Sequence, residues 1–336
     1  MKHVVLLALP ILLLGAGNAS SQHVWFLENR TYFDPVIAET RAATVKACLG
    51  LLGEYPYAEQ PGERLGMDLS VGKEIGFIGL ETAAPTGPPA AGEWGAGIWL
   101  PVSFHMLWDL RDRSQPIINN DYRFGAMIKG VYGITNSSRI ALRLVPWAHE
   151  STHLGDEVVL SARRRLGRGF ERINVSYEFW EAALSYEGDG CASEGSPGRY
   201  KLRAGFTGLH TGYGYYYADP LEVNGAVITP SAARGEPFAE LEWVLPTEVF
   251  AGWQPIISLD ARNRIIYDYH KADPAQPEQR KVSIDAALGI TRTQTMFGST
   301  GNASLYLRLY RGVNPHGQLR SQSSFFITAL GLNITV

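Results

Sequence analysis

The chain has 336 residues, of which 19% are charged and 11% aromatic, and its formal net charge is −3 at neutral pH. Binding to nucleic acid phosphates requires an excess of lysine and arginine, so this charge balance argues against a nucleic-acid partner. Disordered chains have few aromatic residues and a high net charge, and this sequence has neither property.

Residues 1–19 have the features of a secretory signal peptide. An early lysine precedes an apolar run from Val4 to Leu14, and Gly17 and Ala19 have the spacing of a cleavage site. The run is shorter than the ~20 apolar residues of a membrane-spanning helix, and no longer run follows. We therefore expect export, with a mature chain that starts near Ser20.

Residues 20–62 are expected to form an N-terminal periplasmic segment and linker. Within them, residues 34–53 fit a short helix, because Asp34 can cap it, Pro35 suits a first turn and Gly53 can end it. The chain has only two cysteines, which can form one disulfide outside the cytosol but lack the spacing of metal ligands; they are Cys48 and Cys191.

From residue 63 onward the helical period is replaced by segments of about ten residues that alternate apolar and polar side chains. Successive side chains of a strand point to opposite faces, so each segment has one apolar face. Single-chain bacterial barrels usually have an even number of strands, and we predict twelve. The segments lie near 64–72, 73–82, 94–107, 122–134, 138–153, 156–163, 171–185, 199–211, 237–244, 253–269, 281–294 and 303–312, with 324–336 as a candidate thirteenth.

Two architectures fit this pattern, a secreted β-sandwich and a membrane barrel. The long strands, the signal peptide, the abundant tyrosine and tryptophan and the final strand favour the barrel. The predicted fold class is therefore all-β, a transmembrane antiparallel β-barrel of about twelve strands over residues 63–336, with a short N-terminal helical or extended segment. Its expected location is the cell outer membrane, and its expected partners are outer-membrane lipids.

The stretch PWAHESTHLGDEVVL, residues 146–160, gathers histidines, hydroxyls and carboxylates. Simple alternation along its strand places His149, Ser151 and His153 on the charged lumen face, although a bulge at Pro146 would shift them by one position. We predict a network of paired polar groups in the lumen. Besides His149 and Ser151, its expected members are Arg139, Arg143, His153, Asp156, Arg172, Asn174 and Glu178.

Four segments resemble successive landmarks of one bacterial family: INNDYRFGAMIKG, HESTHLGDE, RINVSYE and RGVNPHGQLRSQ. That family is catalogued only as a domain of unknown function, and its members are thought to be outer-membrane β-barrels. The resemblance extends from about residue 30 to the end of the chain. It implies the location and the fold, and it implies no activity.

A local resemblance suggests chemistry. The triplet His149-Glu150-Ser151 is similar to the H-x-S of outer-membrane phospholipase A and the lipid A deacylases, in which the imidazole can activate the hydroxyl. Glu157 could orient the imidazole, and Asp156, Asn174 and Glu178 are alternatives. Thr152 departs from the asparagine of those enzymes, which also present the pair to lipid. The alternative function is thus a lipid acyl hydrolase, and calcium is a candidate cofactor only in that case.

Neither a metal site nor another cofactor is predicted. His149 and His153 are four residues apart, which is about 13 Å along a strand and too far for one ion. A run of arginines is expected either to contact lipid phosphates or to form a solvated loop; it consists of Arg163, Arg164, Arg165 and Arg168. The first-choice function is a narrow or closed barrel that binds or passes a small solute or lipid, or supports the envelope.

Overall fold

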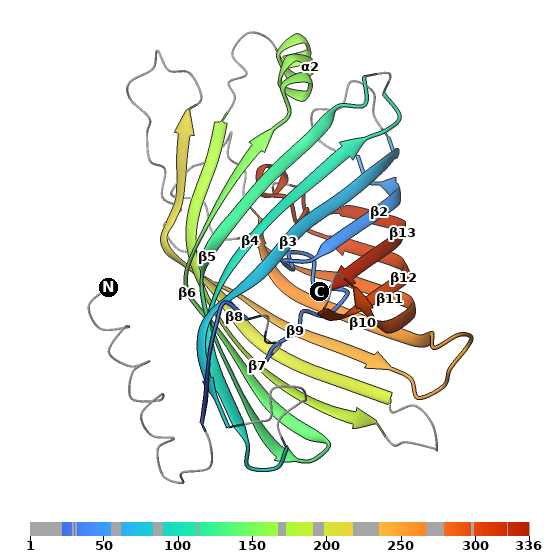
Figure 1. Ribbon diagram of the computed structural model, residues 1–336. Coiled ribbons are helices and arrows are strands. Elements are labelled where there is room, and N and C mark those ends of the chain that lie inside the picture. Colours follow the sequence, from blue (N-terminus) through green and yellow to red (C-terminus); the bar gives the residue numbers. More distant parts are fainter. Residues whose placement is uncertain are drawn as a thin grey trace.

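The computed structural model describes residues 22–28, 30, 32–54, 62–82, 90–112, 114–166, 173–190, 198–217, 235–266, 279–296, 299–320 and 322–335. In these ranges the chain forms one antiparallel sheet with one short α-helix and one 3₁₀ turn (Figure 1). The elements are β1 (His23–Phe26), β2 (Val45–Leu52), β3 (Arg64–Glu81), β4 (Trp94–Asp109), β5 (Ile117–Thr135), β6 (Ser138–Leu154), α2 (Asp156–Leu166), β7 (Ile173–Gly190), β8 (Gly198–Tyr217), β9 (Gly235–Val244), β10 (Gln254–Ile266), β11 (Gln279–Met296), β12 (Ser299–Gly312), η1 (Gly317–Leu319) and β13 (Phe325–Thr335).

The sheet closes into a barrel because β2 pairs with both β3 and β13, while β3 also pairs with β4. Strands β2 to β13 form this closed ring of twelve, which confirms the predicted fold class. β1 pairs with the part of β3 that extends beyond β2, from His23↔Glu81 to Phe26↔Ile78. β1 and β2 therefore occupy the same edge of β3, and the chain between them leaves the wall.

The predicted number of strands is right, but two of the individual predictions are wrong. Residues 64–72 and 73–82, expected as two strands, form the single strand β3. Residues 156–163, expected as a strand, belong to α2. These two differences remove two of the twelve predicted strands. The ring still has twelve because it includes β13, the candidate thirteenth strand, and β2, which lies within the predicted helix.

The helix predicted for residues 34–53 is wrong because the apolar run in VKACLGLL satisfies either period. In β2 the side chains of Lys46 and Cys48 are buried, whereas Leu49 and Leu51 are about half exposed. This alternation is that of a strand with one face to the lumen and the other to the outside. Long-range pairing with β3 and β13 decides between two locally acceptable structures.

The strand predicted for residues 156–163 is wrong, because these residues form α2. In α2, Val158, Val159 and Ala162 are buried on one helical face. Asp156 and Glu157 lie in the first turn, where carboxylates interact favourably with the positive end of the helix dipole. The helix begins after Gly155, whose position a side chain could not occupy, because a Cβ there would lie 1.7 Å from the carbonyl oxygen of Ile117.

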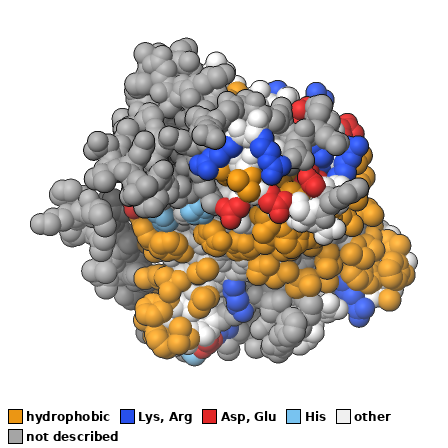
Figure 2. All heavy atoms as spheres, turned by 90° about the horizontal axis from the view of Figure 1, so that it is seen from above, with side chains coloured by type: hydrophobic (Ala, Val, Ile, Leu, Met, Phe, Trp, Pro, Cys, Tyr) orange, Lys and Arg blue, Asp and Glu red, His pale blue; other side chains and the backbone are white. Residues whose placement is uncertain are grey.

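The outer face of the barrel is apolar and the inner face is charged. On β12, Leu305, Leu307 and Leu309 are exposed, while the intervening Arg308 is buried. Figure 2 shows hydrophobic side chains gathered in a broad band across one face of the molecule, with charged side chains beside it. An apolar outer band over a polar interior is the arrangement that a barrel needs in order to sit in a lipid bilayer.

The two ends of the barrel differ in their connections. At one end, β5 and β6 are joined by residues 136–137 and β11 and β12 by residues 297–298. At the other, which we call the α2 end, most connections are longer, among them 155–172 and 313–324, although 110–116 at this end is shorter than 82–93 at the first end. Bacterial outer-membrane barrels likewise have short turns at one end and longer loops at the other.

Candidate functional site in the barrel lumen

The chain between β1 and β2 fills part of the lumen, and we call residues 32–44 the lumen segment. Phe33, Val36 and Ala38 are fully buried. Its backbone is bonded to opposite parts of the wall: the amide of Ala38 donates to Ser258 Oγ of β10 (3.0 Å), while Lys129 Nζ of β5 donates to the carbonyl of Phe33 (3.2 Å). The segment therefore crosses the interior of the barrel.

Charged groups hold the lumen segment in place. Glu39 Oε1 lies 3.2 Å from Arg143 Nη2 of β6, and Arg41 Nη1 lies 2.6 Å from Asp121 Oδ2 of β5. Arg41 also pairs with Glu150 of β6. Burial alone would raise the pKa of Glu39, but Arg143 and other lumen arginines lower it to about 2. Glu39 and Arg143 are consequently both charged at neutral pH.

A second piece of chain enters the lumen from the α2 end. In the β12–β13 connection, Val313, Asn314, His316 and Leu319 are buried. His316 Nδ1 lies 3.3 Å from Asp121 Oδ2, the oxygen that Arg41 also contacts. Burial lowers the pKa of His316, but Asp68 and Asp121 together raise it above its ordinary value. Asp121 thus links the two inserted pieces of chain.

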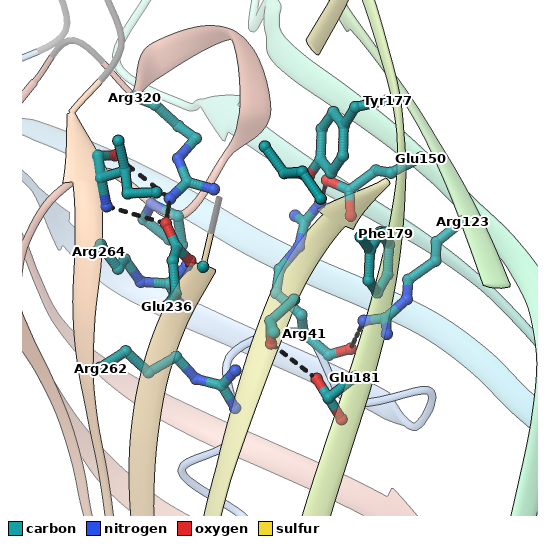
Figure 3. Close-up of a pocket in the computed structure, with 15 residues that line it drawn as sticks. Arg41, Arg123, Glu150, Tyr177, Phe179, Glu181, Glu236, Arg262, Arg264 and Arg320 are labelled. Atoms are coloured by element: carbon teal, nitrogen blue, oxygen red, sulfur yellow. Dashed lines mark hydrogen bonds and ion pairs between the residues drawn. The ribbon is translucent and has the colours of Figure 1, made fainter. Parts of the chain in front are cut away.

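A cavity of about 60 Å³ remains between the inserted pieces and the wall. Figure 3 shows Arg264, Arg320 and Glu236 on one side of it, and Arg123 and Arg41 on the other. Aromatic and aliphatic groups complete its lining. The charged lining residues are five arginines and three glutamates: Arg41, Arg123, Arg262, Arg264, Arg320, Glu150, Glu181 and Glu236.

Two of the arginines expected in the lumen network lie there. Arg143 Nη2 is 2.7 Å from Glu181 Oε1, in addition to its contact with Glu39. Arg139 Nη2 is 2.6 Å from Glu187 Oε2 on β7. Both pairs link neighbouring strands on their inner faces.

The lumen position predicted for His149, Ser151 and His153 is wrong, because β6 contains a bulge. Between Leu144 and Ala148 this strand has one residue more than either neighbour, as its pairings with β5 and β7 show. After the bulge, Ala148, Glu150 and Thr152 are the buried residues. The two histidines and Ser151 therefore face outward, where the imidazole of His149 packs at 5.3 Å from the ring of Phe124.

The three residues of the predicted catalytic set do not assemble. Ser151 Oγ lies 3.0 Å from Nε2 of His153, and His149 Nε2 lies 3.0 Å from Oγ of Ser176 on β7. Glu157 is on α2, where its carboxylate accepts a hydrogen bond from Ser114. The outer face thus has two Ser–His pairs, neither of which is the predicted one.

The remaining predicted site residues lie apart from these pairs or outside the described residues. Glu178, expected in the lumen, lies on the outer face as the cross-strand partner of His149. Asp156 is exposed at the start of α2, whose arginines include exposed Arg163 and Arg164 as well as Arg165. Asn174 pairs with Tyr216 in the β7–β8 ladder. Arg168 and Arg172 lie outside the described residues, and contact of the arginine run with lipid phosphates stays a prediction.

Most of the residues that fill the lumen were not among those predicted from the sequence. Glu39, Arg41, His316 and Arg320 lie in irregular connections, where no period indicates which side chains are buried. Two of them, His316 and Arg320, belong to RGVNPHGQLRSQ, one of the four segments that resemble the bacterial family. For these two residues, the signal available in the sequence was the high density of polar residues directly after a strand.

In the described part of the chain, no helix has the length and hydropathy needed to cross a membrane. Across the same ranges, no three histidine, cysteine or carboxylate residues come together as a metal site would require.

A closed barrel of twelve strands, with an apolar outer band and a charged, occupied lumen, is a β-barrel of the outer-membrane type. Residues 17–192 match the family model described as protein of unknown function (DUF1207), and the chain belongs to this family. No curated protein matches the chain significantly.

Several solved outer-membrane structures resemble the barrel. The transport unit of the autotransporter AIDA-I from Escherichia coli is 14% identical, with 91% of this chain and 94% of that chain covered and a TM-score of 0.38. The translocator domain of NalP from Neisseria meningitidis is 8% identical, with 87% and 86% covered and a TM-score of 0.42. A FadL homologue from Pseudomonas aeruginosa is 11% identical, with 87% and 85% covered and a TM-score of 0.36. Likenesses at this level say nothing about activity.

Proposed function

We propose that the protein is a closed outer-membrane barrel that binds a small solute in its lumen and passes it only when the lumen segment moves. The observation that carries the proposal is that the chain's own residues 32–44 occupy the interior and are held there by buried ion pairs. Removing one partner from a buried ion pair costs about 3–5 kcal/mol. Withdrawal of the lumen segment would separate Glu39 and Arg41 from their partners in the wall, so the closed state is favoured at rest.

The attachment of the lumen segment suggests how it could move. It is bracketed by two strands of the wall, β1 and β2, so it can leave the lumen only as a loop or after one strand detaches. Within the described ranges, β1 has four residues and pairs with β3 alone, whereas β2 has eight and pairs with strands on both sides. β1 is therefore the weaker attachment.

Conductance in planar bilayers tests this proposal. We expect the wild type to be closed, and the double variant Glu39→Gln with Arg41→Gln to conduct at least about tenfold more, since ~1.4 kcal/mol shifts an equilibrium tenfold. The matched control neutralises one exposed residue of each charge, Glu248→Gln with Arg111→Gln, which do not form an ion pair in the described structure. Adding Ala38→Cys and Ser258→Cys, whose disulfide would tie the segment to β10, should close the barrel again until a reductant is added. An open wild type, or a double variant as closed as the control, contradicts the proposal.

A second candidate function, hydrolysis of lipid esters, is favoured by the Ser–His pairs on the outer face. An imidazole nitrogen at 3.0 Å from a serine oxygen can accept the hydroxyl proton and make the serine a nucleophile. Glu178 is the cross-strand partner of His149 in the β6–β7 ladder, and in this candidate function it would orient the same imidazole.

The depth of these pairs suits such a substrate. On β6, Ile140 and its partner Tyr132 lie near the short-turn end, and His149 lies near the α2 end. Counted along β5, Tyr132 and the partner of His149, Phe124, are eight residues apart. At ~3.3 Å per residue and a tilt of ~40°, the two levels differ by about 20 Å, within the ~25 Å height of an apolar barrel band. Phe124 and Tyr122 surround the histidines, as aromatic residues do at a membrane interface.

Phospholipid vesicles that contain the protein test this candidate, with and without calcium. If it holds, the wild type releases fatty acid and labels with a fluorophosphonate, and Ser176→Ala or Ser151→Ala lowers the rate at least about 100-fold. Ser137→Ala, which removes an exposed turn hydroxyl, should leave the rate unchanged. A wild type that neither hydrolyses nor labels eliminates the candidate.

A further inference from the structure

The cavity in the lumen has more positive than negative charge in its lining. Of its glutamates, Glu236 is shared by Arg264 and Arg320, while Glu181 lies 2.7 Å from Arg143, which is outside the lining. None of the ion pairs among the described residues includes Arg123. Its guanidinium instead lies 4.5 Å from the centre of the Phe179 ring and donates to the carbonyl of Arg41 at 3.4 Å.

The lining also has donors without acceptors. Nε of Arg123 and Nε of Arg264 are buried and have no hydrogen-bond partner among the described residues. A buried donor that lacks an acceptor costs roughly 1–3 kcal/mol, and more when the group is charged. An anion between these two side chains would supply both the missing acceptors and the missing charge.

The size of the cavity limits the anion. Its volume is about 60 Å³, several times the roughly 10–15 Å³ that one water needs but small beside the roughly 300–1,000 Å³ of a drug-sized site. Guanidinium groups bind carboxylates and phosphates through two parallel hydrogen bonds. A single acid group with little attached to it satisfies both the volume and the donors.

We infer that this cavity binds a small oxyanion, either inorganic phosphate or a short carboxylate, through Arg123, Arg264 and Arg320. The inference rests on the proposed function and names the class of its solute. Arg41 of the lumen segment and Arg320 of the β12–β13 connection both line the cavity. A bound anion therefore contacts both inserted pieces of chain as well as the wall.

The test uses the full chain, purified and folded in detergent, and needs no membrane. Phosphate and acetate are titrated separately against chloride at equal ionic strength, with heat release and Tm as readouts. At least one oxyanion should bind saturably and raise Tm by a few degrees, as a ligand specific for the folded state does. Arg123→Gln should lower the affinity at least tenfold, and Arg123→Lys, which keeps the charge without the planar fork, should lower it less.

Arg123→Gln breaks none of the described ion pairs, so its barrel should fold, and normal heat-modifiable migration on gels checks that it does. Arg163→Gln removes an exposed positive charge from α2 and is the matched control. No saturable binding of either oxyanion by the wild type overturns the inference, and so does unchanged affinity in folded Arg123→Gln. These readouts involve no current. Anion binding by the wild type, together with no conductance in the double variant Glu39→Gln with Arg41→Gln, would therefore reject only the proposed passage.

Discussion

Replacement of Arg308 by methionine is expected to lower the free energy of unfolding by about 3–5 kcal/mol. The Arg308 side chain is 2% exposed, with Nη1 at 2.5 Å from Asp68 Oδ2 and Nη2 at 2.8 Å from Asp285 Oδ2. Methionine fills a similar volume but leaves two buried carboxylates without their cation. The variant should also loosen the lumen segment and the β12–β13 connection, which contact the same carboxylates. Thr40 Oγ1 of the lumen segment donates to Asp285, and His316 Nε2 of the connection lies 3.5 Å from Asp68 Oδ1.

Urea unfolding in lipid vesicles, followed by tryptophan fluorescence, measures this effect. Arg111→Met, at an exposed position, should change stability by no more than about 0.5 kcal/mol. Combining Arg308→Met with Asp68→Asn and Asp285→Asn should recover part of the loss, because no unpaired charge is then buried. If Arg308→Met costs less than about 1 kcal/mol, the lumen network is not what stabilises the barrel.

The architecture could be predicted because the membrane imposes a simple pattern on each strand. Leu305, Leu307 and Leu309 must face lipid, and Arg308 between them cannot, so alternation alone identifies a strand and its two faces. Where the apolar run was continuous, as in β2, or locally rich in β-branched residues, as in α2, both structures remained acceptable. Pairing with distant strands made β2 a strand, and burial of one face at the barrel end made α2 a helix.

The lumen could not be predicted in the same way. Glu39, Arg41 and His316 lie in connections, and their burial depends on where two distant strands bring the chain. The lumen position predicted for His149, Ser151 and His153 was wrong for a different reason. Pro146 indicated where a bulge could lie, but a bulge is a difference in residue number between neighbouring strands, which one strand's sequence does not contain.

That difference leads to a second large effect: insertion of one alanine between Ala148 and His149 should prevent correct assembly of β6. With one more residue, the side chains that follow exchange faces. Glu150, which pairs with Arg41, would then point to lipid, and His149 would enter the filled lumen. Arg41 would lose one of its two carboxylate partners. We expect loss of heat-modifiable migration and cleavage of the insertion variant by added protease.

Deletion of Pro146 is the matched control, because it also changes the length of β6 by one residue but leaves the faces as they are. Without Pro146, β6 has as many residues as β5 and β7 between Leu144 and Ala148, so Glu150 stays inside and His149 outside. The deletion removes the carbonyl that accepts a hydrogen bond from His210 Nε2 at 2.8 Å, and it should fold within about 2 kcal/mol of the wild type. If the deletion is as damaging as the insertion, the bulge itself is needed for assembly. If the insertion folds normally, β6 can take either register, and the outward position of His149 and Ser151 is not fixed by the strand.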